Sequence, residues 1–233
     1  MFQSLQNMIM NNSAVVIVSG GIDSAVLCYK AVNDGLKIYP LTFIYGQKHS
    51  KEIDSAENIC QNLSLEPNII DISSIKKLLK GSALTDMDIN IPNVSAETKN
   101  YNTLKTTVVP NRNAIFLSIA VGYGESLGVK RIYYGAHYSD RGIYPDCRKE
   151  FVEAFQIAER IANDNNELVI EAPFVDMEKS GIVKLGSSLG VPFEETWSCY
   201  AGLELHCGSC SSCRERKRAF VEAGVNDPTE YLK

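Results

Sequence analysis

The predicted fold is decided by the stretch Ala14-Val-Val-Ile-Val18, which runs directly into Ser19-Gly-Gly-Ile-Asp-Ser24. A short, unbroken apolar run of this kind is typical of a strand buried on both faces of a parallel sheet. Residues 22–34 then place apolar side chains at helical spacing and stop at Gly35, a residue type common just beyond a helix end. The sequence therefore predicts a strand, a glycine loop and a helix in immediate succession.

Further strands and helices alternate along the chain. The pattern predicts strands over residues 37–45, 68–71, 131–136 and 168–170, and helices over 50–63, 112–127, 149–163 and 179–189. Pro40 argues against the full extent of the second strand, because proline cannot donate to a sheet ladder. Strands that alternate with helices of this length indicate an α/β fold, a doubly wound and mostly parallel sheet with helices on both faces.

Two regions interrupt this alternation. Residues 81–110 lack clear periodicity, and a stretch of that length in a compact domain indicates a lid or a binding loop. The segment that begins at Trp197 is dense in cysteine and then in basic residues. We therefore expect an α/β domain over 1–196, which includes the long loop at 81–110, and a metal-binding C-terminal segment over 197–233.

The composition argues against several classes of protein. The chain has 233 residues, 45% of them hydrophobic, and its 23 basic and 28 acidic side chains give a formal charge of −5. This mild acidity argues against duplex nucleic acid as the main partner. No apolar run reaches the roughly 18–20 residues of a membrane span. Residues 1–13 carry no basic side chain, whereas a secretory signal has a positively charged start. We therefore expect a cytoplasmic protein with no membrane segment.

The glycine loop after the first strand has the features of a phosphate-binding site. Glycines allow a tight turn and close approach of a ligand, while free N–H groups at a helix N-terminus point toward an anion. Ser19 and Ser24 add hydroxyl donors, and Asp23 can cap the helix or reach a phosphate-bound Mg²⁺. An ordinary strand–helix turn is the alternative. The string matches neither the Walker A pattern nor the dinucleotide-binding G-x-G-x-x-G pattern.

Four cysteines near the C-terminus have the spacing of a metal site. Cys199, Cys207, Cys210 and Cys213 follow the pattern C-x₇-C-x₂-C-x₂-C, which suits tetrahedral Zn²⁺. An iron–sulfur cluster is the alternative, although the Cys-Pro that completes a ferredoxin run is absent. Because four thiolates leave no open position for water, we expect a structural zinc. His206 is expected to be a bystander, and Cys28 and Cys60 to be core residues.

A run of basic residues follows the cysteines. A solvated helix face, or pairing with acidic parts of the chain, is the default for such a run, and contact with RNA is the alternative. The run consists of Arg214, Arg216, Lys217 and Arg218.

Five motifs, taken in order, resemble one family. SGGIDS at 19–24 resembles the PP-loop of the ATP pyrophosphatase superfamily, and it is followed by YGQKH at 45–49, VPNRN at 109–113, YPDCR at 144–148 and TWSCY at 196–200. The set resembles the 7-cyano-7-deazaguanine synthase family of queuosine biosynthesis over about residues 14–220. The resemblance implies an adenine nucleotide alpha-hydrolase-like fold. It also implies an ATP-dependent carbon–nitrogen ligase that converts 7-carboxy-7-deazaguanine and ammonia to the 7-cyano compound, with Mg²⁺, one Zn²⁺ per subunit and a homodimer.

The resemblance also suggests roles for individual residues. The residues assigned to ATP are Val18, Ser19, Gly20, Gly21, Ile22, Asp23, Ser24, Tyr45 and Gln47. The residues assigned to catalysis are Asp23, Arg112, His137 and Lys179. The residues assigned to the deazaguanine substrate are Arg112, Asn113, His137, Asp140, Asp146 and Arg148. Lys179 would neutralise phosphoryl oxygens and Arg148 would pair with the substrate carboxylate, whereas Cys147 would have a packing role.

Simpler roles and rival functions remain open at this point. Lys179 can be a plain surface lysine and His137 a satisfied structural histidine. The nearest rival function is a related ligase that stops at the amide or joins the deazaguanine carboxylate to another amine. A tRNA-modifying PP-loop enzyme such as a thiolase is a second rival, and a non-catalytic nucleotide-binding and zinc module is a third.

Overall fold

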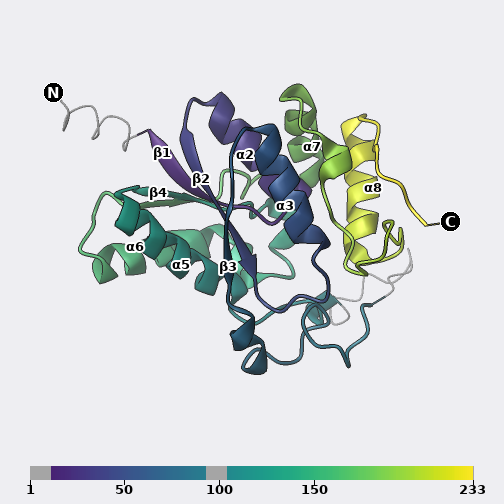
Figure 1. Cartoon of the computed structure of the whole chain (residues 1–233), viewed down its shortest axis with the longest axis horizontal. Coiled ribbons are helices and arrows are strands. Elements are labelled where there is room, and N and C mark those ends of the chain that lie inside the picture. The colour runs from purple at the N-terminus through teal and green to yellow at the C-terminus, as the bar shows by residue number, and fades with distance from the viewer. Residues whose placement is uncertain (1–11, 93–103, 233) are drawn as a thin grey trace.

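The fold is built on one five-stranded, wholly parallel sheet. A computed structural model describes residues 12–92 and 104–232. The strands lie in the order β3-β2-β1-β4-β5 (Figure 1). Their bounds are β1 Ser13–Ile17, β2 Lys37–Ile44, β3 Asn68–Asp71, β4 Arg131–Tyr133 and β5 Val169–Glu171. The predicted α/β class and the parallel sheet are confirmed.

Helices cover both faces of this sheet (Figure 1). Their bounds are α2 Ile22–Asn33, α3 Lys51–Asn62, α5 Arg112–Leu127, α6 Lys149–Ala162, α7 Lys179–Ser188 and α8 Ser211–Ala223. One core packs α2, α3, α7 and α8 against one face, and a second core packs α5 and α6 against the opposite face. Alternate residues of β1 enter the two cores, Val16 on one side and Val15 on the other. This arrangement explains why the first strand is apolar throughout.

Proline lies within a strand that has neighbours on both sides. The carbonyl of Leu41 accepts the N–H of Val18, so the backbone polar groups of Leu41 point toward β1. The backbone polar groups of Pro40 point to the opposite edge of the strand. Pairing with β3 begins only at Leu41, one residue beyond Pro40. The missing N–H of Pro40 therefore costs no ladder bond, and the strand extends further than the proline suggests.

The C-terminal helix packs on the α/β layers. α8 lies beside α7 (Figure 1), and Ala219 and Phe220 of α8 belong to the same core as α2. The four cysteines lie in the connection before α8 and in its first turn. The described part of the C-terminal segment, residues 197–232, is thus attached to the α2 and α7 side of the sheet.

Only parts of two predicted features can be described. In the long loop at 81–110, residues 93–103 lie outside the described residues, as does most of the stretch 1–13. The described parts of the loop join each other, because Ala83 N–H donates to the Thr106 carbonyl. Leu84 and Val109 are buried in the core that holds α5. Among the helices of the described residues, none combines the length and the apolar character that crossing a membrane requires.

Candidate active site

A cavity lies at the carboxyl ends of the central strands. The strand order reverses at β1, since β2 lies on one side of it and β4 on the other. Open parallel sheets bind their ligands at such a switch point. The cavity has a volume of about 210 Å³. It is lined by Ser19 and Gly21 from the loop after β1, and by Gly135 and Ala136 from the loop after β4.

The glycine loop is held in a shape that side chains would obstruct. Gly20 has a φ of +76°, and a Cβ built there would lie 2.2 Å from the carbonyl oxygen of Glu52. The carbonyl of Gly20 accepts the backbone N–H of Trp197, at 2.9 Å. Ser19 N–H donates to Ser24 Oγ at 3.1 Å, which closes the loop on the first turn of α2. The loop therefore requires glycine and is tied to the cysteine-rich segment.

The N-terminus of α2 offers free donors to the cavity. Among the described residues no side chain caps its first turn, although Asp23 and Ser24 both lie there. Uncapped N–H groups at a helix N-terminus bind anions such as phosphate. The buried Oδ1 of Asp23 has no hydrogen-bond partner among the described residues. An atom of this kind fits a group supplied by a ligand, such as Mg²⁺ held between a carboxylate and phosphates.

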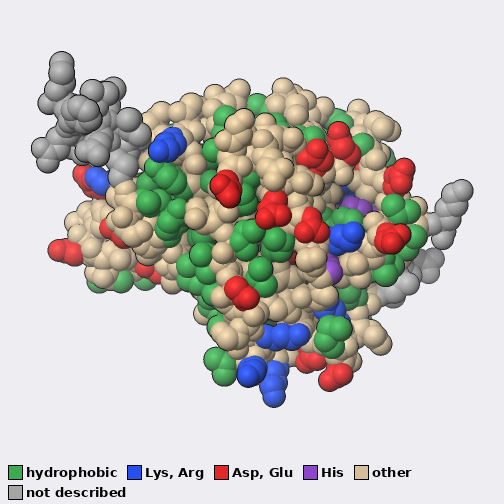
Figure 2. Space-filling model, in the orientation of Figure 1, with side chains coloured by type: hydrophobic (Ala, Val, Ile, Leu, Met, Phe, Trp, Pro, Cys, Tyr) green, Lys and Arg blue, Asp and Glu red, His purple; other side chains and the backbone are tan. Residues whose placement is uncertain are grey.

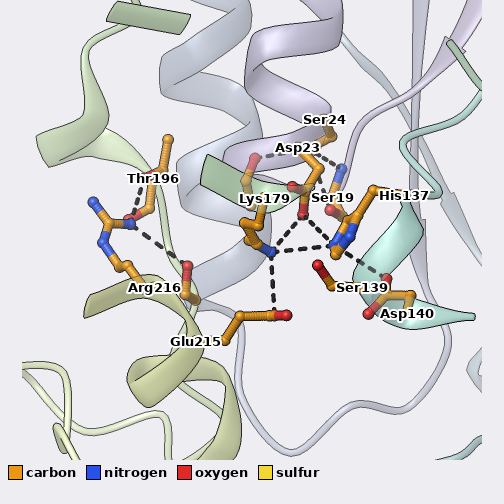
Figure 3. A network of polar contacts seen from close by, with 12 residues as sticks. Ser19, Asp23, Ser24, His137, Ser139, Asp140, Lys179, Thr196, Glu215 and Arg216 are labelled. Atoms are coloured by element: carbon orange, nitrogen blue, oxygen red, sulfur yellow. Dashed lines mark hydrogen bonds and ion pairs between the residues drawn. The ribbon is translucent and has the colours of Figure 1, made fainter. Parts of the chain in front are cut away.

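Lys179 lies at the centre of a charged network next to this helix end (Figure 3). Its Nζ lies 2.8 Å from Asp23 Oδ2 and 3.6 Å from Glu215 Oε2. Burial opposes the charge on Lys179, but Asp23, Glu215 and Asp140 outweigh burial and raise the pKa of its ammonium. Burial likewise acts to raise the pKa of Asp23, but Lys179 and His137 hold that pKa below its usual value. At neutral pH the pair is fully charged.

His137 and Asp140 form the other side of the network. The side chain of His137 is only 1% exposed, and its Nε2 lies 3.3 Å from Asp140 Oδ2 and 3.7 Å from Asp23 Oδ2. Its Nδ1 has no partner among the described residues. Burial raises the pKa of Asp140 to about 6, although His137 opposes this shift. Asp140 itself lines the cavity and can exchange a proton near neutral pH.

The opposite half of the cavity is aromatic. Tyr45 and Phe116 line it and meet edge to face, with ring centroids 5.4 Å apart. The guanidinium of Arg112 lies 5.8 Å from the centre of the Tyr45 ring. Glu52 also lines this half, and burial raises its pKa to about 7 against the opposing effect of Arg112. A flat heterocycle with polar edges suits such a lining.

The turn before α5 explains how Arg112 reaches the cavity. Asn111 has a φ of +57°, in the left-handed region that asparagine adopts more readily than most residues. Arg112 is the first residue of α5. The string VPNRN therefore turns the chain sharply and delivers Arg112 and Asn113 to the cavity wall.

The structure brings most of the predicted site residues to this cavity. Those that line it are Ser19, Gly21, Ile22, Asp23, Ser24, Tyr45, Arg112, Asn113, Asp140 and Lys179. His137 lies behind the wall in the charged network. Gly20 and Val18 fix the shape of the loop through backbone hydrogen bonds. The Gly20 carbonyl accepts the N–H of Trp197, and the N–H of Val18 donates to the Leu41 carbonyl in β2.

Besides Val18, Gly20 and His137, three predicted residues lie outside the cavity lining. Gln47 supports the end of β2, because its Oε1 accepts the N–H of Tyr45 at 2.8 Å. Asp146 accepts the N–H of Asn113 at 3.1 Å and so fixes the start of α5. Arg148 donates to the Arg141 carbonyl at 2.9 Å and lines a separate hollow with Asp146.

Two acidic residues of the cavity were missed by sequence reasoning. Glu52 lies in the first turn of α3, where an acid is also an ordinary helix-start residue. Glu215 lies inside the basic run 214–218, and its one signal is the helical spacing from Ser212, which also lines the cavity. Both carboxylates were hidden because they come from helices far from the glycine loop in sequence.

The four cysteines are grouped as a metal site requires. One sulfur from each of Cys199, Cys207, Cys210 and Cys213 lies within 4.8 Å of each of the other three. The sulfurs of Cys207 and Cys213 are 3.9 Å apart, close to the spacing of about 3.8 Å in a tetrahedron with Zn–S bonds near 2.3 Å. Backbone N–H groups of Ala201 and Cys207 donate to the Cys199 sulfur and favour its thiolate. The donor set fits zinc.

Side chains around the cysteines tie them to the cavity. Trp197 lines the cavity and packs against His206, with ring centroids 4.3 Å apart and ring planes tilted by 40°. His206 Nε2 accepts the N–H of Ser198 at 3.1 Å, so this nitrogen is already engaged. Arg216 is 0% exposed, unlike a residue on a solvated face. It pairs with Asp227 at 3.1 Å and donates to Thr196 Oγ1 at 2.7 Å. The start of α8 is therefore fixed next to the cavity.

Fold and site together define the class of protein. A parallel sheet with a glycine loop after β1 and a helix that starts at the switch point defines an open α/β protein, a class that binds its ligands at this edge of the sheet. The chain is similar to NMN synthetase from Francisella tularensis, with a TM-score of 0.52 and 15% identity over 96% of this chain and 85% of that chain. At this identity the likeness shows the fold alone.

Comparison with protein families then places the chain more narrowly. The model of the family described as queuosine biosynthesis protein QueC matches residues 13–224. Relatives named 7-cyano-7-deazaguanine synthase include one from Psychromonas ingrahamii, 46% identical over 95% of this chain and 99% of its own length. Another, from Caldicellulosiruptor bescii, is 49% identical over 94% of this chain and 96% of its own length. The chain belongs to the QueC family, which confirms the resemblance carried by its motifs.

Proposed function

We propose that this chain converts 7-carboxy-7-deazaguanine, ammonia and ATP into 7-cyano-7-deazaguanine. The observation that carries the proposal is one cavity with two chemically different halves. One half has the glycine loop, the open helix end and Lys179, which suit a triphosphate. The other half has Tyr45, Phe116 and Arg112, which suit a flat heterocyclic acid. Membership in the QueC family supports the same substrate.

The chemistry requires that a poor electrophile be activated twice. A carboxylate oxygen attacks the α-phosphorus of ATP, pyrophosphate leaves, and the adenylate that forms gives ammonia a leaving group to displace. The resulting amide oxygen then attacks the α-phosphorus of a second ATP and pyrophosphate leaves; loss of AMP and of both protons on the amide nitrogen gives the nitrile. We favour AMP and pyrophosphate as products because the superfamily to which the loop belongs adenylates substrate oxygens.

The residues of the cavity account for this work. The N–H groups of the loop and Lys179 would hold the phosphates while negative charge develops between them. Asp23, through its unpartnered Oδ1, would hold a phosphate-bound Mg²⁺. Arg112 would pair with the carboxylate of the acid, and Asn113 next to it would contact the heterocycle. A small-molecule substrate, as opposed to nucleic acid, agrees with the net charge of −5 and with the face shown in Figure 2, where acidic side chains are widely spread and basic ones gather mainly at the lower edge.

Mass spectrometry of one incubation tests the proposal. Purified protein with Mg-ATP, ammonium and 7-carboxy-7-deazaguanine should yield a product lighter than the acid by the change from carboxyl to nitrile. An amide that accumulates, or an adenylate that reacts only with another amine, would favour the related ligase. Tight ATP binding without any turnover would favour a non-catalytic module.

Zinc is proposed as the metal of the four cysteines, with a structural role. Removal of the metal should lower the melting temperature by more than about 10 °C, because metal binding to such sites supplies folding free energy. Thermal unfolding before and after chelation measures this effect, and added zinc should restore the original value. Unchanged melting after complete metal loss would contradict the structural role.

Because the thiols must stay reduced to hold a metal, we also propose a cytoplasmic location.

A homodimer is proposed through the outer face of α6. Ile157 and Ile161 lie one turn apart on this helix and are 57% and 77% exposed. Contiguous exposed apolar surface is a feature of protein–protein contacts. The double change Ile157→Glu with Ile161→Glu should therefore convert a dimer to a monomer in light scattering. Val221→Glu on α8, at an equally exposed position, should leave the dimer intact.

A further inference from the structure

Glu52 is an acid of the cavity whose carboxylate has no direct partner among the described residues. It is half-buried in the first turn of α3 and lines the aromatic half of the cavity. Its carboxylate makes neither a hydrogen bond nor an ion pair with any described residue. Burial raises the pKa of this carboxyl to about 7, against the opposing charge of Arg112. A carboxylate that has lost water without gaining a donor fits a ligand that brings donors of its own.

The neighbouring guanidinium does not fill this need. Arg112 attracts Glu52 through space, but among the described residues the two side chains form no ion pair. The guanidinium lies over two aromatic rings, 5.8 Å from the centre of Tyr45 and 6.0 Å from that of Phe116. The cavity therefore holds a positive and a negative group near each other without a direct contact between them.

The backbone that carries Glu52 is fixed by the glycine loop. The N–H of Ile53 donates to the Ser50 carbonyl at 2.7 Å, which closes the start of α3. The carbonyl oxygen of Glu52 lies 2.2 Å from the point that a Cβ of Gly20 would occupy, so the helix start and the loop are in close contact. A side chain held on such a support can recognise a ligand without a large loss of entropy.

The proposed substrate carries acceptors and donors in a fixed order along one edge. In 7-carboxy-7-deazaguanine the carboxylate and the neighbouring ring carbonyl are acceptors, and the N1–H and the 2-amino group that follow them are donors. A guanidinium complements the first two groups, and a carboxylate accepts two parallel hydrogen bonds from the last two. Arg112 and Glu52 supply this pair of groups in one half of the cavity, where Tyr45 and Phe116 suit the flat ring faces.

From this match we infer that Glu52 binds the N1–H and the 2-amino group of the substrate and so selects guanine-type acids. The inference rests on the proposed function. An acid without the 2-amino group leaves part of the carboxylate unpaired, and a heterocycle with an acceptor at N1 is repelled. The ribose of ATP also carries two donors, but it lacks the flat faces that the aromatic lining around Glu52 suits.

Calorimetric titration of the zinc-loaded protein tests the inference. Two acids are compared in the presence of a nonhydrolysable ATP analogue: 7-carboxy-7-deazaguanine, and the same acid with hydrogen in place of the 2-amino group. The unchanged protein should bind the amino compound about tenfold to a hundredfold more tightly, because the other acid leaves a charged acceptor without its donor. In Glu52→Gln this preference should fall below about threefold, since the charge and one acceptor are lost.

The matched control lies on the same helix. Glu57 is also half-buried, but it lines a separate hollow with Gln61, and Glu57→Gln should leave both affinities within about twofold. Glu52→Gln should not lower the melting temperature, because no protein group loses a direct partner with the charge. A lower melting temperature with equal weakening of both acids would show that Glu52 only supports Arg112, and would overturn the inference.

The other outcomes are equally distinct. If Glu52→Gln weakens binding of the ATP analogue alone, Glu52 binds the ribose hydroxyls and the inference fails. It also fails if the variant keeps the full preference for the amino compound, because another group then recognises that edge. An unchanged protein that binds the acid with the expected preference, but forms neither amide nor nitrile, would overturn the proposed function and leave the inference standing. Absence of binding to either acid would overturn both.

Discussion

Replacing Lys179 with methionine should lower kcat about 10²–10³-fold while the fold survives. Lys179 supplies the positive charge nearest the helix end of α2, and preorganised charges of this kind contribute that much to transition-state stabilisation. The change also leaves Asp23 and Glu215 facing each other without their common cation. Steady-state formation of the nitrile measures the effect.

The matched control lies on the same helix. Lys184 is an exposed residue of α7, and Lys184→Met should leave kcat within twofold. Because Lys179→Arg keeps the charge, it should recover part of the lost rate. Equal losses in the variants at 179 and 184 would show that Lys179 has no special role.

The second large effect is expected at Gly20. Gly20→Ala should cost about 2–5 kcal/mol of unfolding free energy, since it combines a left-handed backbone with a steric clash. The new Cβ would lie 2.2 Å from the backbone oxygen of Glu52, which α3 holds rigidly. Urea unfolding measures the cost, and ATP binding should be lost with the loop shape.

Gly35 supplies the control for backbone strain. It has a φ of +80°, close to that of Gly20, but a Cβ at Gly35 would meet no atom within 4 Å. Gly35→Ala should therefore cost only the strain, about 1–2 kcal/mol. If the two variants lose equal stability, the contact between the loop and α3 is not the reason for glycine at position 20.

Periodicity was enough to predict the layers of the fold. The unbroken apolar run at β1 reflects burial on both faces, and the third strand, at 68–71, matches β3 residue for residue. The extent of β2 around Pro40 could not be predicted, because the sequence does not show where pairing with β3 begins. That start decides whether the missing N–H of Pro40 costs a ladder bond. The burial of Arg216 could not be predicted either, because its partner Asp227 lies eleven residues further along the chain.

The site was predictable where its residues belong to one local motif. The spacing of the residues in the glycine loop and of the four cysteines indicates a phosphate site and a metal site, and the structure brings each set together. Glu52 and Glu215 were not predictable, because helix packing brings them to the cavity and acids on exposed helices look the same in sequence. Asp146 shows the reverse, since it lies in a strong motif yet binds the backbone of Asn113.

We propose above all that the chain activates the carboxylate of a deazaguanine by adenylation. The most direct test uses acid labelled with ¹⁸O at both carboxylate oxygens, followed by mass spectrometry of the nucleotides and the heterocycle. We expect two AMP for each nitrile, each carrying one ¹⁸O from the acid. Unlabelled AMP, or label found in inorganic phosphate beside ADP, would contradict it.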